Sequence, residues 1–324
     1  MGYRITLQRS IRDHNEVMPF SSGLVGRQGT SKADFIGYFW ISATIEISKS
    51  RRYFFQNFFF IEEMSKTFDS LEEFRFREGV TPFSSSWIPL VTCVLYFTLT
   101  RAFKLFVFNR KPLRSSLLLF LYNISLSFFS LILFISLGAV IFEKIQLYTP
   151  HELVCGSTIH HDGRLQFIYW LNYLFKYVEL FDTFLLVARK KPVTFLHEYH
   201  HAATLVLCWI EQREYSTVQW VPIFLNLGVH VIMYYYFAMT ALKRELWWKR
   251  YLTSLQIFQF IIDVFVCSYA YGVFILNGFD FDKCYGTELG AIAGIVVLFS
   301  YLALFVRFYM NTYKKKQLKD KKDT

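Results

Sequence analysis

Residues 115–142 read SSLLLFLYNISLSFFSLILFISLGAVIF, a run without a single charged side chain. A transmembrane α-helix needs about 20 consecutive, predominantly apolar residues, so this stretch alone is long enough to cross a bilayer. Similar runs lie on both sides of it. The sequence predicts seven membrane-spanning helices, over residues 84–100, 115–142, 166–187, 194–210, 217–240, 251–275 and 288–309.

The composition supports this class of protein. Of the 324 residues, 54% are hydrophobic, 20% aromatic and only 19% charged, against about 25% charged in a typical soluble domain. So aromatic a chain is not intrinsically disordered, and its long apolar runs exclude an outer-membrane barrel, whose strands show alternating segments of about 10 residues. We therefore expect an all-α, polytopic membrane protein.

The membrane domain is predicted to span residues 84–312, between an extension and a tail. The extension, residues 1–83, is mixed in charge, and we expect it to be lumenal and partly disordered. The tail, residues 313–324, is short and basic. Connections rich in Lys and Arg alternate with poor ones, and Lys and Arg concentrate on the cytosolic side of membrane proteins. The N-terminus is therefore predicted to be lumenal and the C-terminus cytosolic.

Two short features fit an endoplasmic reticulum protein with this topology. Lys321 and Lys322 stand fourth and third from the C-terminus, the pattern of a dilysine retrieval signal read by a receptor. Cys155 and Cys284 fall in predicted lumenal connections, where disulfides can form, and we expect them to pair. The net charge of +10 lies in loops and tail, so we expect no nucleic-acid partner.

The third predicted span carries charged side chains where they are expensive. Charged groups inside a bilayer usually mark a functional site. Lys176, Glu179 and Asp182 share one helical face, and the first two are spaced to form an ion pair. A structural pair joining two helices would explain Lys176 and Glu179, but it would not need Asp182.

The next three spans also present polar stripes. His197, His200 and His201 stand at positions i, i+3 and i+4, so they share one face of the fourth span. The fifth span brings Asn226 and His230 one turn apart. The sixth brings Gln256 and Gln259, with Thr253 and Asp263 on the same stripe. Four consecutive spans with polar stripes predict one shared polar interior.

Imidazole can act as a base, a nucleophile or a metal ligand, which leaves alternatives open. A membrane di-iron desaturase or hydroxylase uses similar histidine clusters. The chain has eight histidines, but only four of them lie in the predicted core, and such an enzyme uses several more. Acyl transfer needs no metal: an imidazole can take an acyl group from a thioester while a neighbour handles protons. A seven-helix receptor or transporter would not need this histidine cluster.

Four motifs resemble the signature of the ELO family of fatty-acid elongases. That family shows KxxExxDT, HxxHH, NxxxHxxMYxYY and TxxQxxQ in this order. The corresponding residues here are Lys176, Glu179, Asp182 and Thr183; His197, His200 and His201; Asn226, His230, Met233, Tyr234 and Tyr236; and Thr253, Gln256 and Gln259. The resemblance covers roughly residues 84–324. Phe237 replaces the last tyrosine of the third motif, which removes one hydroxyl.

The resemblance implies a seven-helix enzyme of the endoplasmic reticulum that encloses an acyl-chain tunnel. Such an enzyme condenses malonyl-CoA with a long-chain acyl-CoA, giving CoA, CO2 and a 3-oxoacyl-CoA, with no metal and no bound cofactor. The implied partners are the 3-ketoacyl-CoA reductase, the 3-hydroxyacyl-CoA dehydratase and the enoyl-CoA reductase of the elongation cycle. A homo-oligomer stays open, as does the preferred acyl chain.

The resemblance also implies a role for each motif. His197 is the expected acyl acceptor with His230 facing it, while His200 and His201 would move protons and orient the thioester. A single condensation step with a histidine acting only as base is the alternative. The other expected substrate-binding residues are Lys176, Glu179, Asp182, Asn226, Tyr234, Tyr236, Gln256, Gln259, Arg189, Lys190 and Lys191.

Overall fold

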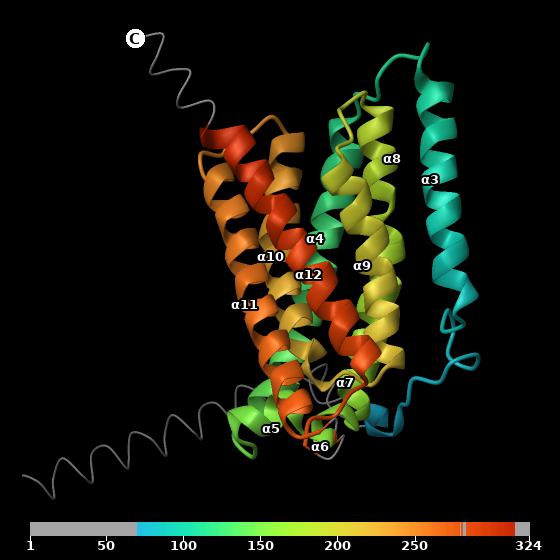
Figure 1. The fold of residues 1–324 in the computed structure, drawn as a ribbon. Helices are drawn as coiled ribbons and strands as arrows, with labels where there is room; N and C mark the ends of the chain where they lie inside the picture. The colour runs from blue at the N-terminus through green and yellow to red at the C-terminus, as the bar shows by residue number, and fades with distance from the viewer. Residues whose placement is uncertain (1–69, 279, 281–282, 315–324) are drawn as a thin grey trace, which may run out of the picture. The chain divides into compact units, whose positions relative to one another are not determined.

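A computed structural model describes residues 70–278, 280 and 283–314, all within one compact unit, Met64–Thr324. Throughout these residues every regular element is helical, as predicted. The long helices are α3 (Trp87–Val107), α4 (Ser116–Ile145), α7 (Gly163–Glu179), α9 (Phe195–Arg213), α10 (Trp220–Ala241), α11 (Lys249–Leu276) and α12 (Glu288–Tyr309) (Figure 1). Most of the predicted extension and the retrieval signal, Lys321 and Lys322, lie outside the described residues, and the predicted domain boundaries stay predictions.

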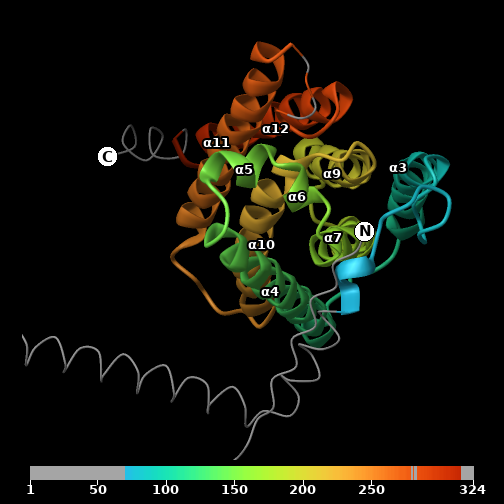
Figure 2. The same ribbon diagram turned by 90° about the horizontal axis from the view of Figure 1, so that it is seen from below.

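Most of the long helices close into a ring. Helix α4 packs against α7 and α10, α10 against α11, α11 against α12, α12 against α9, and α9 against α7. Figure 2 shows this ring end-on, with α3 outside it. Helix α3 contacts α9 and the short helix α8 (Phe181–Ala188), which follows α7 after Leu180. Because four ring helices carry the polar stripes, the ring gives those stripes a common interior.

Among the described residues, five helical segments are long and apolar enough to cross a membrane. They are α3, α4, α10 with the preceding η2 (Thr217–Gln219), α11, and α12 with most of the following η3 (Met310–Lys314). The other two predicted spans lie on α7 with α8 and on α9. Helix α7 is only 17 residues long and stops before α8, and α9 contains Glu198, Glu211 and three histidines. The count of seven spans therefore stays a prediction.

Helix caps fix where the functional helices begin. Ser115 accepts a hydrogen bond from the Leu118 backbone at the start of α4. Thr194 accepts one from the backbone N–H of His197 (3.3 Å), which starts α9 at Phe195. Such caps satisfy backbone donors that the first helical turn leaves unpaired. The cap of α9 therefore sets the height and rotation of the three histidines in its first two turns.

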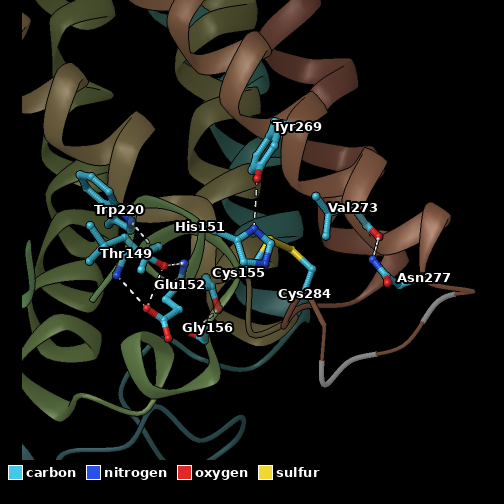
Figure 3. The surroundings of a disulfide bond; sticks show 12 residues. Thr149, His151, Glu152, Cys155, Gly156, Trp220, Tyr269, Val273, Asn277 and Cys284 are labelled. Atoms are coloured by element: carbon cyan, nitrogen blue, oxygen red, sulfur yellow. Dashed lines mark hydrogen bonds between the residues drawn. A yellow bond between two sulfur atoms is a disulfide. The ribbon is translucent and has the colours of Figure 1, made fainter. Parts of the chain in front are cut away.

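A disulfide closes the end of the ring opposite the histidines. It joins Cys155, the last residue of α5 (Pro150–Cys155), to Cys284, with 4.2 Å between their Cα atoms (Figure 3). These are the two cysteines that the sequence analysis paired. The backbone of Tyr285 also donates to Cys155 O (2.9 Å). Helix α5 and the segment before α12 are thus joined by the disulfide and by a backbone hydrogen bond.

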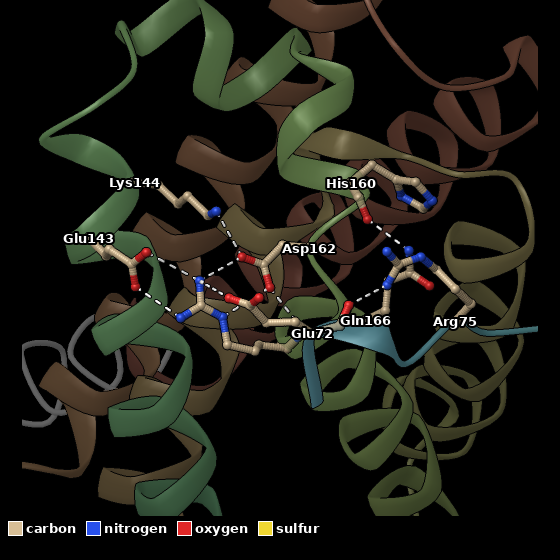
Figure 4. A network of polar contacts seen from close by, with 8 residues as sticks. Glu72, Arg75, Glu143, Lys144, His160, Asp162 and Gln166 are labelled. Carbon is tan, nitrogen blue, oxygen red and sulfur yellow. Dashed lines mark hydrogen bonds and ion pairs between the residues drawn. The ribbon is translucent and has the colours of Figure 1, made fainter. Parts of the chain in front are cut away.

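A polar network fixes the start of α7 at the same end. Arg164 donates to Asp162 and Glu143, and Lys144 forms an ion pair with Asp162 (2.8 Å) (Figure 4). Burial alone would raise the pKa of Asp162, but the hydrogen bonds from Arg164 and Lys144 lower it to about 2. The nearby His160, at the end of α6 (Ser157–His160), has its pKa lowered to about 4, chiefly by burial.

Candidate active site

A buried ion pair on α7 is linked by a hydrogen bond to the polar stripe of α10. Lys176 Nζ lies 2.9 Å from Glu179 Oε1, and the two side chains are 2% and 1% exposed. The same ammonium donates to Asn226 Oδ1 (3.0 Å) across the ring interior. Because a buried charge is stable only when it is paired and hydrogen-bonded, Lys176, Glu179 and Asn226 stabilise one another's positions.

His230 is oriented by the same network. Its Nδ1 lies 3.2 Å from Glu179 Oε1, close enough for an ion pair but without hydrogen-bond alignment. Its Nε2 lies 3.2 Å from Asn226 Nδ2. Since Asn226 Oδ1 already accepts from Lys176, its amide nitrogen donates to Nε2. The neutral ring then carries its proton on Nδ1, facing Glu179, and the Nε2 lone pair is occupied.

The three histidines of α9 have different surroundings. His197 Nε2 lies 3.0 Å from Thr183 Oγ1, which in turn hydrogen-bonds the Tyr96 hydroxyl (2.6 Å). The His201 Nε2 atom lies 4.0 Å from Asp182 Oδ2. His200 faces α12 instead, with its ring centroid 4.9 Å from that of Tyr301. The three imidazoles therefore have different neighbours, although the ring centroids of His197 and His201 lie only 4.4 Å apart.

A central cavity of about 230 Å3 brings most of the predicted residues together. Its wall includes all four histidines, Asp182, Asn226, Tyr234, Gln256 and Gln259. Tyr234 donates to Asp182 Oδ2 (2.8 Å), which orients this carboxylate beside His201. Among the described residues, no group of three or more His, Cys, Asp or Glu side chains is arranged to hold a metal ion.

An outer cavity of about 460 Å3 adjoins the central one. The two share Asp182, His197 and Phe237, so they meet at these side chains. Three cations line the outer cavity: Arg189, Lys191 and Lys249. A basic chamber therefore stands next to the histidines.

The outer cavity differs from the expected site in three residues. Lys190, expected beside Arg189 and Lys191, donates its ammonium to Phe108 O (2.8 Å) at the end of α3. Its backbone has a positive φ of 55°, which turns it away from its neighbours. Tyr236 lines the outer rather than the central cavity, and Lys249, which the sequence analysis did not single out, lines it too.

An inner cavity continues from the central one in the other direction. The two share His200, Asn226, Gln259 and Phe260. The inner cavity is largely apolar and ends at a smaller one, which reaches Cys284 of the disulfide. The outer, central, inner and smaller cavities thus form a row through the ring, with the histidines near its middle.

Two tyrosines of the site were missed from the sequence. Tyr301 of α12 donates to the His200 backbone carbonyl (3.2 Å) and bonds Thr204 (2.9 Å). Tyr96 of α3 reaches His197 through Thr183. The chain has 21 tyrosines, and neither of these two belongs to a motif, so only their contacts in the folded protein distinguish them from the others.

The part of the chain that the structure describes is all-helical, has five helices fit to cross a membrane and surrounds a buried histidine cluster, so this is a multi-pass membrane protein. Residues 81–321 match the GNS1/SUR4 family, ELO, and the chain belongs to this family. It is 34% identical to fatty acid elongase A of Dictyostelium discoideum over 266 residues, 81% of this chain and 96% of the relative. It is 30% identical to very long chain fatty acid elongase 5 of Mus musculus over 252 residues, 74% and 78% of the two chains. The resemblance stated from the four motifs is confirmed.

Proposed function

We propose that this chain is the condensing enzyme of fatty-acid elongation, a 3-oxoacyl-CoA synthase. It joins malonyl-CoA to a long-chain acyl-CoA and releases CoA and CO2. Its family and its elongase relatives support this activity. The observation that carries the proposal is the row of three cavities: a basic one, one lined by four histidines, and a largely apolar one.

The three cavities match the three parts of an acyl-CoA. Arg189, Lys191 and Lys249 suit the phosphates of the CoA moiety, since guanidinium and ammonium groups form charge-assisted hydrogen bonds with phosphate. The inner cavity accepts the acyl chain. The thioester then lies in the central cavity, among the histidines, and both CoA thioesters enter as substrates without a bound cofactor or metal.

Two observations favour His200 over His197 as the acyl acceptor. His200 lines both the central and the inner cavity, where the acyl carbon of a bound chain belongs, whereas His197 lines the central and outer cavities. His197 Nε2 is also hydrogen-bonded to Thr183. His230 is disfavoured because its Nε2 lone pair is engaged by Asn226.

In the first half-reaction, an imidazole nitrogen of His200 attacks the thioester carbonyl carbon. The new C–N bond replaces the C–S bond, and the CoA thiolate leaves. The imidazole N–H proton passes through the neighbouring His201, whose ring centroid is 5.5 Å away, to the thiolate. Amide donors of Gln256 and Gln259 stabilise the negative charge that develops on the carbonyl oxygen.

In the second half-reaction, malonyl-CoA loses CO2 and leaves the enolate of acetyl-CoA. The enolate carbon attacks the acyl-imidazole carbonyl, so that a C–C bond forms and the C–N bond breaks. His200 takes up a proton from solvent, and a 3-oxoacyl-CoA longer by two carbons is released. The Lys176–Glu179 pair and Asn226 keep His230 oriented in the wall.

The proposal includes a place in the cell. The chain has seven membrane spans, with α7–α8 and α9 as the third and fourth, a lumenal N-terminus and a cytosolic C-terminus. The disulfide between Cys155 and Cys284 fits the lumenal side. The chain resides in the endoplasmic reticulum, retrieved by Lys321 and Lys322. The reductases and the dehydratase of the elongation cycle consume its product.

The test measures two-carbon elongation by membranes that contain the full chain. Labelled malonyl-CoA is supplied with a panel of saturated and unsaturated acyl-CoAs. We expect labelled products in the wild type and their loss in His200→Ala. His151→Ala is the matched control, because this histidine lies on α5 against Tyr269, away from the central cavity, and should keep full activity.

Mass spectrometry of the protein with acyl-CoA alone separates the two mechanisms. An acyl adduct on the peptide that contains His200 supports the acyl-enzyme, whereas its absence in an active preparation favours the single-step alternative. If folded wild-type protein elongated no acyl-CoA in the panel, the proposed function would be wrong.

A further inference from the structure

The inner cavity contains polar oxygens that a plain hydrocarbon chain would leave unpaired. Asn172 Oδ1, Glu211 Oε1, Gln219 Oε1 and Asp263 Oδ1 belong to side chains that line it, and none has a hydrogen-bond partner among the described residues. Asp263, Asn172 and Gln219 are 0%, 1% and 3% exposed. Buried polar atoms are nearly always paired, so four together point to a ligand that supplies donors.

Two of these oxygens, those of Asp263 and Gln219, belong to side chains that are held in place by their other polar atom. Asp263 Oδ2 accepts from Gln259 Nε2 (3.1 Å), and Gln219 Nε2 donates to Ser216 O (2.8 Å). Asp263 and Gln219 are therefore oriented while one oxygen of each has no hydrogen-bond partner among the described residues. The remaining wall is largely apolar, which matches ligand sites where a few placed polar groups select the ligand.

Glycine makes room for one of these oxygens. A Cβ atom built on Gly294 of α12 would lie 2.9 Å from Glu211 Oε1, too close for a real contact. Any larger residue at Gly294 would therefore press on the carboxyl group of Glu211. The sequence keeps the space beside this carboxyl group open, at the lower end of the inner cavity.

We propose that the inner cavity selects an acyl-CoA whose chain carries a hydroxyl group. The proposal rests on the proposed function, because it assigns the substrate class of that same site. A hydroxyl is neutral and small enough to travel with the chain, and it can donate to an amide or a carboxyl oxygen. A site built to hydrogen-bond a hydroxyl discriminates strongly against the analogue that lacks it.

The geometry gives the position of the hydroxyl along the chain. From His200 to Glu211, α9 advances about 16 Å at about 1.5 Å per residue. An extended chain covers about 1.2 Å per bond, judged from about 3.5 Å for the three bonds of an extended residue. Glu211 therefore meets the chain about 14 bonds beyond the reacting carbon. Asp263, one turn beyond Gln259, meets it after about five bonds.

The experiment compares three CoA thioesters in membranes that contain the full chain. They carry hexadecanoyl, 6-hydroxyhexadecanoyl and 15-hydroxyhexadecanoyl chains, and kcat/KM is measured with labelled malonyl-CoA. The variants Asp263→Leu and Glu211→Leu each remove both carboxyl oxygens of one side chain. The variants Asp263→Asn and Glu211→Gln keep one oxygen that can accept a hydrogen bond from the hydroxyl. Ser268→Leu is the matched control, since it is exposed on α11, the helix that carries Asp263.

In the wild type we expect both hydroxylated chains to be elongated more efficiently than the plain chain. Asp263→Leu should lower the preference for the 6-hydroxy chain by about 5- to 150-fold and spare the 15-hydroxy chain, and Glu211→Leu should do the reverse. The amide variants and the Ser268→Leu control should keep both preferences.

Two results would overturn the inference. One is a wild type that elongates the plain chain as well as or better than the hydroxylated chains. The other is a pair of leucine variants that elongate the plain chain yet leave both preferences unchanged, as expected if water alone fills these positions. Failure to elongate any of the three would instead count against the proposed function.

Discussion

The ion pair between Lys176 and Glu179 offers the sharpest test of how this site is held together. Its atoms are 2.9 Å apart and its side chains are 2% and 1% exposed, so neither charge is solvated by water. The variant Glu179→Gln keeps the shape of the side chain but removes its charge. The Lys176 ammonium then stays buried with only amide oxygens as partners.

Removing one partner of a buried ion pair costs about 3–5 kcal/mol, because the other charge is left without compensation. For a protein of this size, each kcal/mol lowers the Tm by about 2–4 °C. Glu179→Gln should therefore lower the Tm by roughly 6–20 °C. The double variant Lys176→Met/Glu179→Gln should be more stable than the two single losses predict, because it leaves no uncompensated charge.

The assay is thermal unfolding of the purified protein in detergent, followed by two independent probes. Glu78→Gln is the matched control, since Arg213 Nε lies 3.0 Å from Glu78 Oε2 with side chains 42% and 40% exposed. An exposed pair contributes about 0–1 kcal/mol, so the control should shift the Tm by less than about 4 °C. Equal shifts in Glu179→Gln and Glu78→Gln, or strictly additive losses in the double variant, would refute this reasoning.

Three further predictions concern the end of the ring opposite the α9 histidines. Burial lowers the pKa of His160 to about 4, so between about pH 6.5 and 4 this histidine takes up a proton only in the unfolded chain. The free energy of unfolding should therefore fall by up to about 3 kcal/mol as the pH is lowered through this range. The variant His160→Gln should reduce this loss when unfolding is measured from pH 7 to 5. The disulfide spans 129 residues, so Cys155→Ser should cost about 2–5 kcal/mol in thermal unfolding, whereas Cys93→Ser, which breaks no disulfide, should cost less. Gly163→Ala should destabilise the fold by about 1–3 kcal/mol, because the added Cβ would clash with the Glu72 carbonyl oxygen. Gly272→Ala is the control: it has open space around it and should be neutral or stabilising by up to about 1 kcal/mol. Equal Tm values for the two variants would contradict both expectations.

Much of the site could be predicted from helical spacing. Residues three or four positions apart share a face, so the stripe of His197, His200 and His201 had to point in broadly one direction. The cost of charge inside a bilayer then indicated that the stripes face one another. The structure agrees, since Asn226 of α10 meets Lys176 of α7 and all four histidines line one cavity.

Other features depend on contacts that spacing does not encode. Lys190 follows Arg189 in the same basic run, but its positive φ sends it to the end of α3. Tyr301 and Tyr96 reach the histidines from helices that carry no motif. The break after Glu179 separates α7 from α8, although the apolar pattern runs on without a gap. Backbone conformation at a single residue and the choice of neighbouring helix decide each of these cases.

The different surroundings of the histidines bear on how one cluster of histidines supports two chemical roles. A nucleophile needs a lone pair that no neighbour occupies, whereas an orienting residue needs its ring fixed by partners. His230 meets the second requirement, because Asn226 and Glu179 flank both of its nitrogens. His200 sits at the junction of two cavities, against an aromatic ring rather than a carboxylate, which fits the first requirement.

If His230 were the acyl acceptor, it would have to break its contact with Asn226, so Asn226→Ala would then raise rather than lower the rate of acyl-adduct formation. We expect the opposite: with His200 as acceptor, Asn226→Ala should slow adduct formation, because it leaves His230 and Lys176 without the amide between them.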